Sequence, residues 1–281
     1  MDICIGDNMI VNIAGYKFVT ISENQLPAMR VALKDTAAEC DLMGTILLSP
    51  EGINSFLAGT RENIDRYKNF LDTYPELTHI VFKESFTNYQ PFNRLLVRLK
   101  KEIIALGQDS VKPEKQTAPY ISPEEFKKWY EEKRDMIVLD TRNDFEVDLG
   151  TFENAVDLHI QKFRDFTDAI DFLPADIKQK PIVTFCTGGI RCEKAAELMR
   201  QKGFTNVYQL DGGILNYFEK CGGKFYNGEC FVFDQRVAVD AKLQETKTCQ
   251  CFDCRTPLRK NAIVDGKCPF CGSDAISKKA A

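Results

Sequence analysis

Strand-like apolar runs and amphipathic helical stretches alternate through residues 16–101, which form one predicted folding unit. Strands are predicted at Tyr16–Ile21, Gly44–Leu48, Ile53–Ala58, Thr78–Lys83 and Arg94–Lys100. Helices are predicted at Gln25–Cys40 and Thr60–Thr73. This order contains the βαββαβ pattern that is typical of a ferredoxin-like or acylphosphatase-like α+β sandwich, a fold that hosts many functions and fixes none.

A change in composition marks the boundary to a second domain. Between residues 105 and 121 the hydrophobic period fades while proline, glycine, glutamine and lysine accumulate. This predicts a linker after an N-terminal domain of residues 1–104. A helix start follows, because Ser122 can cap it and Glu125 can return a bond to the cap. The second domain is therefore expected to cover residues 122–223.

Strands and helices take turns in this second domain. Strand-like runs lie at Met136–Asp140, Ala155–Ile160, Pro181–Phe185 and Asn206–Leu210. Helical stretches lie at Phe163–Phe172, Ile190–Lys202 and Ile214–Cys221. Repeated β-then-α order predicts a mainly parallel sheet covered by helices on both faces. Ligand sites in such sheets lie at the carboxyl ends of the strands, and Cys186 stands at one of these ends.

The last segment, residues 224–281, changes character again. An aromatic, β-like run from Lys224 to Phe233 contains Asn227-Gly228, a dipeptide typical of hairpin turns. Cysteine dominates the remainder. The segment is expected to form a β-hairpin and a small cysteine-rich module.

Composition narrows the class of protein. The chain has 281 residues, which favours two domains or one domain with substantial appendages. It is 44% hydrophobic and 28% charged, as globular proteins are. It contains no apolar run long enough to span a bilayer and no secretory signal at its start, so no membrane partner and a cytoplasmic location are expected. The eleven cysteines are not spaced like a disulfide scaffold, which indicates reduced thiols, metal binding and catalysis.

The strongest chemical signal is the loop after the buried strand Pro181–Phe185, with the sequence Cys186-Thr187-Gly188-Gly189-Ile190-Arg191. The two glycines can turn successive amide groups toward one point, and the following helix and Arg191 add positive charge. Each of these effects favours the thiolate over the thiol. A lone cysteine is usually a small buried hydrophobe, but this combination predicts that Cys186 is a reactive nucleophile.

A second cysteine pattern lies near the C-terminus. Two C-x-x-C pairs separated by thirteen residues suit a tetrahedral zinc ion held by Cys251, Cys254, Cys268 and Cys271. Four thiolates leave no open coordination position, so the zinc is expected to be structural. Cys249 could compete for one ligand place. The cysteines without a pairing pattern are expected to be structural, namely Cys4, Cys40, Cys221 and Cys230.

The net charge of −4 gives no overall attraction to nucleic acid, so RNA binding would need a local basic face. One candidate is the last strand of the N-terminal domain, with Arg94, Arg98, Lys100 and Lys101. Strand alternation places Arg94, Arg98 and Lys100 on one face, and Leu95, Val97 and Leu99 on the other. The alternative is a solvated edge strand without a partner.

The catalytic loop and its surroundings resemble the rhodanese homology domain. The segment from Asp140 to Glu146 is similar to the early Asp–Arg–Glu motif of that family, and the resemblance implies that Asp140 and Arg142 brace the loop. A surface ion pair is the alternative for both residues. Four residues separate Cys186 from Arg191, which is the loop length of sulfur-handling rhodaneses, whereas the related phosphatases have one residue more. Phosphatase activity is therefore not expected.

A wider resemblance covers both domains. Three segments are similar to the bacterial rhodanese-containing tRNA uridine hydroxylases, namely residues 44–54, 98–103 and 186–195. This resemblance implies an enzyme that makes 5-hydroxyuridine at the wobble position, with a tRNA anticodon stem-loop as partner and O2 as co-substrate. Neither a flavin nor a haem signature is present, and a two-His-one-carboxylate iron site would require both His79 and His159.

Several alternatives stay open at this point. Cys186 can attack C6 of the uracil, or it can carry a persulfide or an oxidised sulfur. Cys192 can resolve an oxidised Cys186, or it can pack in the helix. His159 can face the site or be structural. The rivals to the hydroxylase are a sulfurtransferase that passes sulfane sulfur from Cys186 to an acceptor, and a zinc-stabilised adaptor with an inert fold. The electron donor, protein partners and oligomeric state are not given by the sequence.

Overall fold

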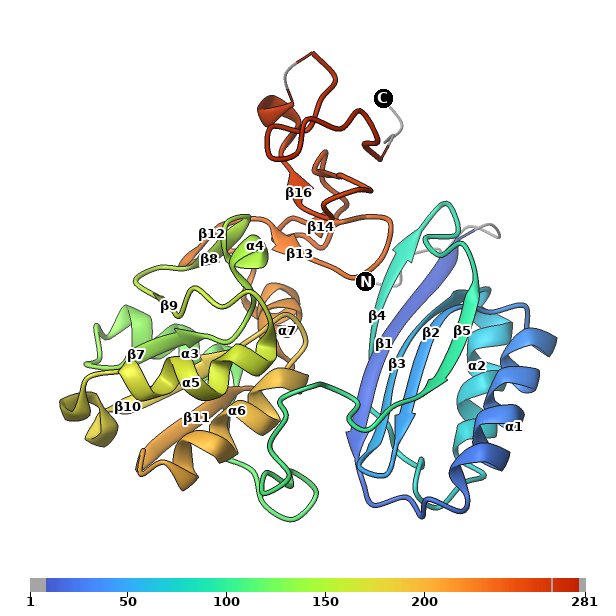
Figure 1. Ribbon diagram of the computed structural model, residues 1–281, viewed down its shortest axis with the longest axis horizontal. Helices are drawn as coiled ribbons and strands as arrows, with labels where there is room; N and C mark the ends of the chain where they lie inside the picture. The colour runs from blue at the N-terminus through green and yellow to red at the C-terminus, as the bar shows by residue number, and fades with distance from the viewer. Residues whose placement is uncertain (1–8, 264, 278–281) are drawn as a thin grey trace. The chain divides into compact units, whose positions relative to one another are not determined.

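The computed structural model describes residues 9–263 and 265–277 (Figure 1). The expected structural role of Cys4 therefore lies outside the described residues. The chain divides into two compact units. The first consists of Met1–Ala105 with Lys112–Gln116, and the second of Leu106–Val111 with Thr117–Ala281.

The first unit is built on a five-stranded sheet with the order β4-β1-β3-β2-β5. Its strands are β1 (Ile10–Phe18), β2 (Met43–Ser49), β3 (Gly52–Gly59), β4 (Phe82–Thr87) and β5 (Leu95–Leu99). Neighbouring strands are antiparallel except β2 and β5, which are parallel. The helices α1 (Leu26–Glu39) and α2 (Arg61–Leu71) pack their apolar residues against one face of this sheet (Figure 1). The predicted acylphosphatase-like sandwich is confirmed.

Two strand positions differ from the prediction, since β1 begins at Ile10 and β4 begins at Phe82. Thr78 and His79, the first residues of the run predicted as a strand, lie in a turn instead. His79 has a φ of 59°, and its amide N–H donates to the Asp72 carboxylate at 3.1 Å. The local sequence after His79 does not determine where the strand starts. Its register is set by pairing with β1, which places Phe82 opposite Gly15.

The second unit contains a parallel sheet with the order β6-β11-β10-β7-β9. Its strands are β6 (Tyr120–Ile121), β7 (Ile137–Asp140), β9 (Val156–Asp157), β10 (Pro181–Phe185) and β11 (Asn206–Leu210). The two residues of β6 lie within the segment predicted to be a linker, but they pair with β11. The predicted rhodanese-like parallel α/β architecture is confirmed.

Side-chain alternation along β10 explains the helical layers of this unit. Val183 and Phe185 point into a core shared with α3 (Pro123–Glu131) and α7 (Gly213–Cys221). Thr184 points to the other face, where its hydroxyl interacts with Cys192 of α6 (Ile190–Gln201). Helices therefore cover both faces of the sheet, as predicted (Figure 1).

The start of α3 follows the predicted cap in part. Ser122 Oγ accepts the amide N–H of Glu125 at 3.1 Å, and Pro123 occupies the first turn. The Glu125 carboxylate, however, accepts a hydrogen bond from the indole N–H of Trp129 at 2.7 Å. The Glu125 side chain thus fixes a core residue of the same helix.

Two elements of the second unit are shorter than predicted. The helix expected at Phe163–Phe172 is divided into η1 (Phe163–Asp165), α5 (Phe166–Ala169) and η2 (Ile170–Phe172). Strand β9 ends at Asp157 because the Asp157 carboxylate accepts the amide N–H of His159, which has a φ of 52°. The remaining short elements are α4 (Asp144–Val147), β8 (Gly150–Phe152) and η3 (Ala175–Gln179).

The predicted hairpin at Asn227-Gly228 is wrong. Strand β12 (Tyr226–Gly228) pairs with β8, while β13 (Cys230–Phe231) pairs with β14 (Ala238–Val239). Gly228 has a φ of 94°, and a Cβ there would lie 2.2 Å from the Leu149 carbonyl oxygen. Glycine is required at this position by the close approach of two strands, which local sequence does not reveal.

The C-terminal module contains β15 (Cys249–Gln250), β16 (Pro257–Leu258) and η4 (Lys260–Ala262). The Arg259 guanidinium connects this module to the segment between α4 and β8, because Nη2 donates to the carbonyl oxygens of Asp148 at 3.2 Å and Leu149 at 2.8 Å. Among the described residues, every helix is too short or too polar to cross a membrane.

Candidate active site

Cys186 lies directly after β10, at the carboxyl end of a central strand. The chain then turns through Gly189, whose φ of 100° is in the left-handed region, before α6 begins at Ile190. In this turn the Gly189 amide N–H donates to Cys186 Sγ at 3.1 Å. The loop therefore directs a backbone donor at the sulfur, as the paired glycines predict.

The start of α7 fixes the same loop from the other side. The amide N–H groups of Ile214 and Leu215 donate to the carbonyl oxygens of Cys186 at 2.9 Å and Thr187 at 3.1 Å. Gly213 allows this contact, since a Cβ there would lie 2.4 Å from the Cys186 carbonyl oxygen. The loop carbonyl groups thus point toward α7, and the Gly189 amide is left to face the sulfur.

Opposing effects act on the Cys186 thiol. Burial raises its pKa, but a hydrogen bond from the Cys192 thiol, the charge of Arg191 and the backbone N–H groups of Arg191 and Gly189 together lower the pKa to about 6. Burial and the neighbouring Cys186 raise the pKa of Cys192 well above its ordinary value. The two sulfurs therefore differ in protonation, with a thiolate at Cys186 and a thiol at Cys192.

A buried carboxylate holds the Arg191 side chain. Arg191 Nη1 and Nη2 donate to the two carboxylate oxygens of Glu146 at 2.5 and 2.8 Å. Burial raises the pKa of Glu146, but the charge and hydrogen bonds of Arg191 outweigh burial and lower it. The bidentate pair orients the guanidinium beside Cys186. Glu146 belongs to the Asp–Arg–Glu motif, yet its contact with Arg191 was not predicted.

Asp140 and Arg142 form a second ion pair, with both side chains fully buried. Arg142 Nε and Nη2 donate to the Asp140 carboxylate at 2.9 and 2.6 Å, and Nη2 also donates to the Gly150 carbonyl oxygen at 2.7 Å. Thr151 Oγ1 donates to the same carboxylate at 2.8 Å. The burial of both partners excludes the surface ion pair that the sequence left open.

The other loop residues have distinct environments. Thr187 is buried, and its hydroxyl lies 3.4 Å from both Glu146 Oε1 and the Phe231 carbonyl oxygen. Ile190 is also buried, whereas Gly188 is half-buried with open space where a Cβ would stand. A Cβ atom at Gly188 would therefore meet no other atom within 4 Å.

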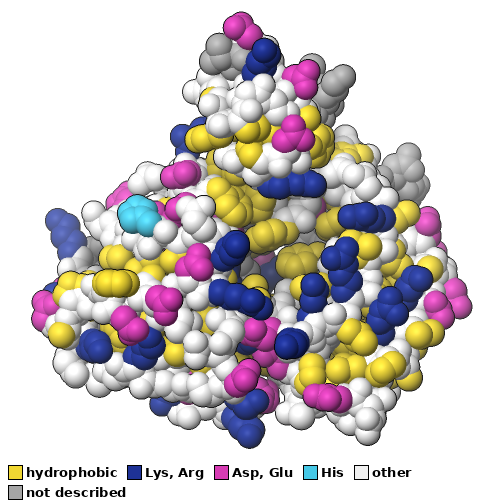
Figure 2. Space-filling model, viewed as in Figure 1, with side chains coloured by type: hydrophobic (Ala, Val, Ile, Leu, Met, Phe, Trp, Pro, Cys, Tyr) yellow, Lys and Arg dark blue, Asp and Glu magenta, His cyan; other side chains and the backbone are white. Residues whose placement is uncertain are grey.

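The four basic residues predicted to bind RNA lie in or directly beside the edge strand β5. Arg94, Arg98, Lys100 and Lys101 are all exposed, and Arg98 belongs to β5 at the edge of the sheet. Val97 is buried as predicted, but Leu99 is 42% exposed, so the apolar face of the strand ends at Val97. Lys and Arg side chains also gather on the face of this unit that Figure 2 shows.

The four cysteines of the two C-x-x-C pairs form a compact group whose sulfur atoms lie within 4.8 Å of one another. The Sγ atoms of Cys251 and Cys271 are 3.6 Å apart, and those of Cys254 and Cys268 are 3.7 Å apart. Cys249 does not belong to this group, and its thiol donates to the Lys247 carbonyl oxygen at 3.5 Å. The competition predicted for Cys249 is not found.

The remaining candidates lie apart from the loop. The His159 side chain is 82% exposed and contacts the Asp157 carboxylate at 3.2 Å, so it lies on the surface rather than in the core. In the aromatic run that follows α7, Tyr226 is buried, and its hydroxyl donates to the Gly150 carbonyl oxygen at 2.8 Å. Phe225 stacks on Tyr130 with ring centroids 4.8 Å apart.

Both halves of the chain match known domain families. Residues 10–103 match the UPF0176 acylphosphatase like domain, and residues 122–220 match the rhodanese-like domain. The tRNA uridine(34) hydroxylase of Paraburkholderia xenovorans is 46% identical over 97% of this chain and 99% of its own length. The tRNA uridine(34) hydroxylase of Cupriavidus taiwanensis is 47% identical over 93% of this chain and 96% of its own length. The chain belongs to the tRNA uridine(34) hydroxylase family.

Among solved structures, the rhodanese-like domain from an Anabaena protein overlaps 39% of this chain and 79% of that chain, at 22% identity and a TM-score of 0.33. The relatives in the hydroxylase family, in contrast, match nearly the whole chain. The match extends over the N-terminal unit and the cysteine-rich module as well as the catalytic loop.

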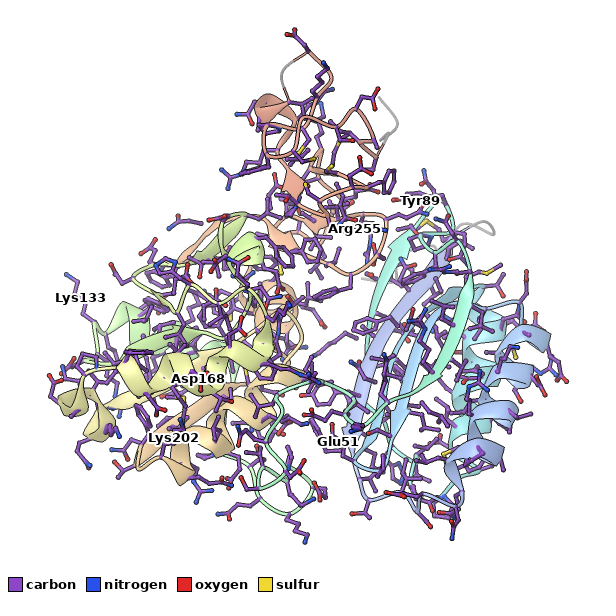
Figure 3. The ribbon with its side chains drawn as sticks, viewed as in Figure 1. Glu51, Tyr89, Lys133, Asp168, Lys202 and Arg255 are labelled. Atoms are coloured by element: carbon purple, nitrogen blue, oxygen red, sulfur yellow. The ribbon has the colours of Figure 1, made fainter. Side chains whose placement is uncertain are left out.

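Two of the three segments that resemble the hydroxylase family meet in the N-terminal unit. The Glu51 carboxylate accepts the amide N–H of Ile103 at 2.7 Å, and Asn54 Nδ2 donates to the Ile103 carbonyl oxygen at 3.2 Å. Glu51 is labelled in Figure 3. These bonds fix the chain that leaves the basic strand β5 against the turn between β2 and β3.

Cys186 is expected to titrate near pH 6 rather than near its ordinary value of 9.0. The thiolate fraction should fall as the pH decreases through this midpoint. The difference in thiolate ultraviolet absorbance between wild type and Cys186→Ser measures the titration. Cys192→Ala should raise the midpoint because it removes a hydrogen bond to the thiolate. A midpoint near the ordinary cysteine value in wild type would contradict the electrostatics of the loop.

Proposed function

We propose that this protein hydroxylates C5 of uridine 34, the wobble position of tRNA, with O2 as co-substrate. The uridine position is the one named for the relatives that match 97% of the chain. The observation that carries the proposal is that this match over nearly the whole chain coincides with a cysteine in a rhodanese loop whose pKa is lowered in favour of the thiolate. According to this proposal, the enzyme is an oxidoreductase that acts on RNA.

Cys186 is proposed to act as a nucleophile toward the uracil ring. Addition of a thiolate to C6 makes C5 electron-rich, and C5 is the carbon that receives oxygen. Arg191, held by Glu146, and the Gly189 amide stabilise the thiolate before attack and receive it again when the ring is released. Asp140 and Arg142 are positioning residues, because their buried pair fixes the chain on which Glu146 lies.

Isotope labelling tests the reaction. Purified enzyme would be incubated with an unmodified tRNA transcript under labelled dioxygen in ordinary water, and nucleosides would be analysed by mass spectrometry. We expect 5-hydroxyuridine at position 34 to carry one labelled oxygen atom. Label that comes from water instead of O2 would contradict the oxygen-dependent reaction, and unchanged uridine would contradict the hydroxylase itself.

A second candidate function is sulfur transfer from Cys186 to a thiol or another acceptor. The six-residue loop favours this activity, because a sulfane sulfur fits in a space where a phosphate group would be crowded. Thiosulfate consumption in the absence of RNA separates the two candidates. Efficient transfer without any 5-hydroxyuridine product would favour the sulfurtransferase.

The basic edge strand is proposed to contact tRNA phosphates through Arg94, Arg98, Lys100 and Lys101. Their exposure on one edge of the sheet supports this role. Each phosphate contact contributes roughly 0.7–0.9 to the slope of log affinity against log salt concentration. The wobble base is single-stranded, so it can leave its stack and enter a catalytic pocket.

Replacing these four basic residues with alanine should weaken tRNA binding and reduce its salt dependence. The expected loss of slope is roughly 0.7–0.9 for each phosphate contact removed. Binding is measured by fluorescence anisotropy over a range of salt concentrations. A matched variant, Lys34→Ala with Arg66→Ala, removes charges on the two helices of the same unit and should leave the slope unchanged. Equal effects of both variants would argue against a specific role for the strand.

The cysteine group is proposed to hold one structural zinc ion. A tetrahedral ion with Zn–S bonds of about 2.3 Å needs sulfur atoms about 3.8 Å apart. The observed separations of 3.6 and 3.7 Å fit this geometry. Cys251, Cys254, Cys268 and Cys271 would all be ligands, and the ion would cross-link the two ends of a module with little apolar core.

Zinc removal should unfold the C-terminal module and leave the parallel sheet intact. Chelation is expected to abolish hydrogen-exchange protection within residues 249–277, because metal binding supplies much of the folding free energy of such modules. Metal analysis of Cys268→Ser should show loss of zinc. Cys249→Ser is the matched control, since Cys249 lies outside the group and its replacement should keep the metal. Retention of zinc by Cys268→Ser would contradict the assignment.

A further inference from the structure

Cys192 lies in the first turn of α6, and its amide N–H donates to the Gly189 carbonyl oxygen at 3.0 Å. Its Sγ is 3.8 Å from the hydroxyl of Thr141. That hydroxyl in turn donates to the carbonyl oxygen of Phe185 at 2.9 Å, directly before Cys186. These contacts place the second sulfur at the base of the catalytic loop, where it hydrogen-bonds Cys186.

The proposed hydroxylation has an electron requirement that Cys186 alone does not meet. One oxygen atom of O2 enters the uracil and the other leaves as water, so the reaction consumes two electrons and two protons in addition to the substrate. Two neighbouring thiols that become a disulfide release two electrons and two protons. Cys186 and Cys192 are two such thiols, and neither forms a disulfide in this structure.

We infer that Cys192 is the second redox cysteine of the reaction and that the Cys186–Cys192 dithiol supplies both electrons. The inference rests on the proposed hydroxylase function. The net reaction is uridine plus O2 plus two thiols, giving 5-hydroxyuridine plus water plus one disulfide. An external dithiol then reduces the disulfide and restores the enzyme for the next turnover.

Each step of this reaction conserves atoms and electrons. The Cys186 thiolate forms a bond to C6, and C5 takes up O2 and a proton as a hydroperoxide. The Cys192 sulfur then cleaves the O–O bond, which leaves a hydroxyl group on C5 and a sulfenic acid on Cys192. Loss of the C5 proton expels Cys186 and restores the ring. Finally, the Cys186 thiolate attacks the sulfenic acid, so that the disulfide forms and water leaves.

The environment of Cys192 fits this order of events. Before attack, burial and the adjacent Cys186 raise the pKa of Cys192, so it remains a protonated thiol and does not compete for the substrate. When the Cys186 sulfur is bonded to carbon, its negative charge is lost, and one cause of the raised pKa disappears. Cys192 therefore becomes more nucleophilic after the first step.

A reductant-free reaction tests the inference. Enzyme reduced beforehand and freed of reductant, with its metal retained, would be mixed with unmodified tRNA transcript in air-saturated buffer. We expect wild type to form at most one equivalent of 5-hydroxyuridine per chain, together with an equal amount of Cys186–Cys192 disulfide identified by peptide mass spectrometry. Dithiothreitol should then restore multiple turnover.

Two variants distinguish a specific role of the Cys192 thiol from a general effect of removing any cysteine. Cys192→Ser should form at least about tenfold less product in the absence of reductant, because the hydroperoxide has no neighbouring thiol to reduce it. Cys221→Ala removes a half-buried thiol of α7 and should behave like wild type. Disulfide mapping in wild type keeps the test decisive even if Cys192→Ser does not fold.

Several outcomes would overturn the inference while leaving the hydroxylase intact. These are product in large excess over chains without reductant, stoichiometric product with both cysteines still reduced, and equal disulfide formation without RNA. If wild type makes no 5-hydroxyuridine even with dithiothreitol, the proposed function fails as well, so the two failures are distinguishable.

Discussion

Replacing Cys186 with alanine is expected to lower the rate of 5-hydroxyuridine formation by at least about a thousandfold. The variant keeps the loop, the basic strand and the cysteine-rich module, but it removes the sulfur atom that is proposed to attack the base. No other cysteine takes its place, since Cys192 is fully buried at the base of the loop. The rate is measured by nucleoside mass spectrometry under single-turnover conditions with excess enzyme.

Two comparisons make this result specific. Cys186→Ala should bind tRNA with unchanged affinity, because the proposed phosphate contacts lie on the N-terminal unit. Cys221→Ala should keep the wild-type rate, which shows that thiol loss alone has no effect. Substantial hydroxylation by Cys186→Ala would mean that the nucleophile of the reaction has been misassigned.

Arg142→Met is expected to lower the free energy of unfolding of the second unit by about 3–5 kcal/mol. The substitution leaves the buried Asp140 carboxylate without its counter-ion and removes one of the two hydrogen bonds to the Gly150 carbonyl oxygen, which keeps the bond from the Tyr226 hydroxyl. Urea titration measures the change through the fluorescence of Trp129, the single tryptophan of the chain, which is buried in this unit.

A matched control uses an ion pair that water already screens. Lys180 contacts Asp135 at 3.1 Å, but the Asp135 side chain is 79% exposed. Lys180→Met should therefore change the free energy of unfolding by less than about 1 kcal/mol. If Arg142→Met has an effect as small as this control, the buried pair does not stabilise the fold around the loop.

Local sequence was sufficient to predict the central element of the site. Strand β10 has the predicted bounds Pro181–Phe185, and α6 ends one residue before the predicted Lys202. The prediction succeeds because a short apolar run, paired glycines and an amphipathic helix are signals within one stretch of chain. The four metal-ligand candidates were likewise recognisable from spacing alone, and the structure brings their sulfurs together.

Contacts between distant segments were not predictable in the same way. The hairpin expected at Asn227-Gly228 is replaced by pairing with residues 150–152, because the glycine serves a close backbone approach rather than a turn. The bonds from α7 to the loop carbonyls join residues 186–187 to residues 214–215, and no local pattern reveals them.

The sequence by itself determined the fold class and the family of the chain, and it predicted Cys186 as the reactive residue. Only the tertiary structure decided that Glu146 holds Arg191, that α7 anchors the loop, and that Cys192 hydrogen-bonds Cys186. The physical reason is the distance along the chain over which each interaction acts. Propensity, capping and spacing act within a few residues, whereas the charge and hydrogen bonds that tune a thiolate come from segments that meet only when the sheet is complete.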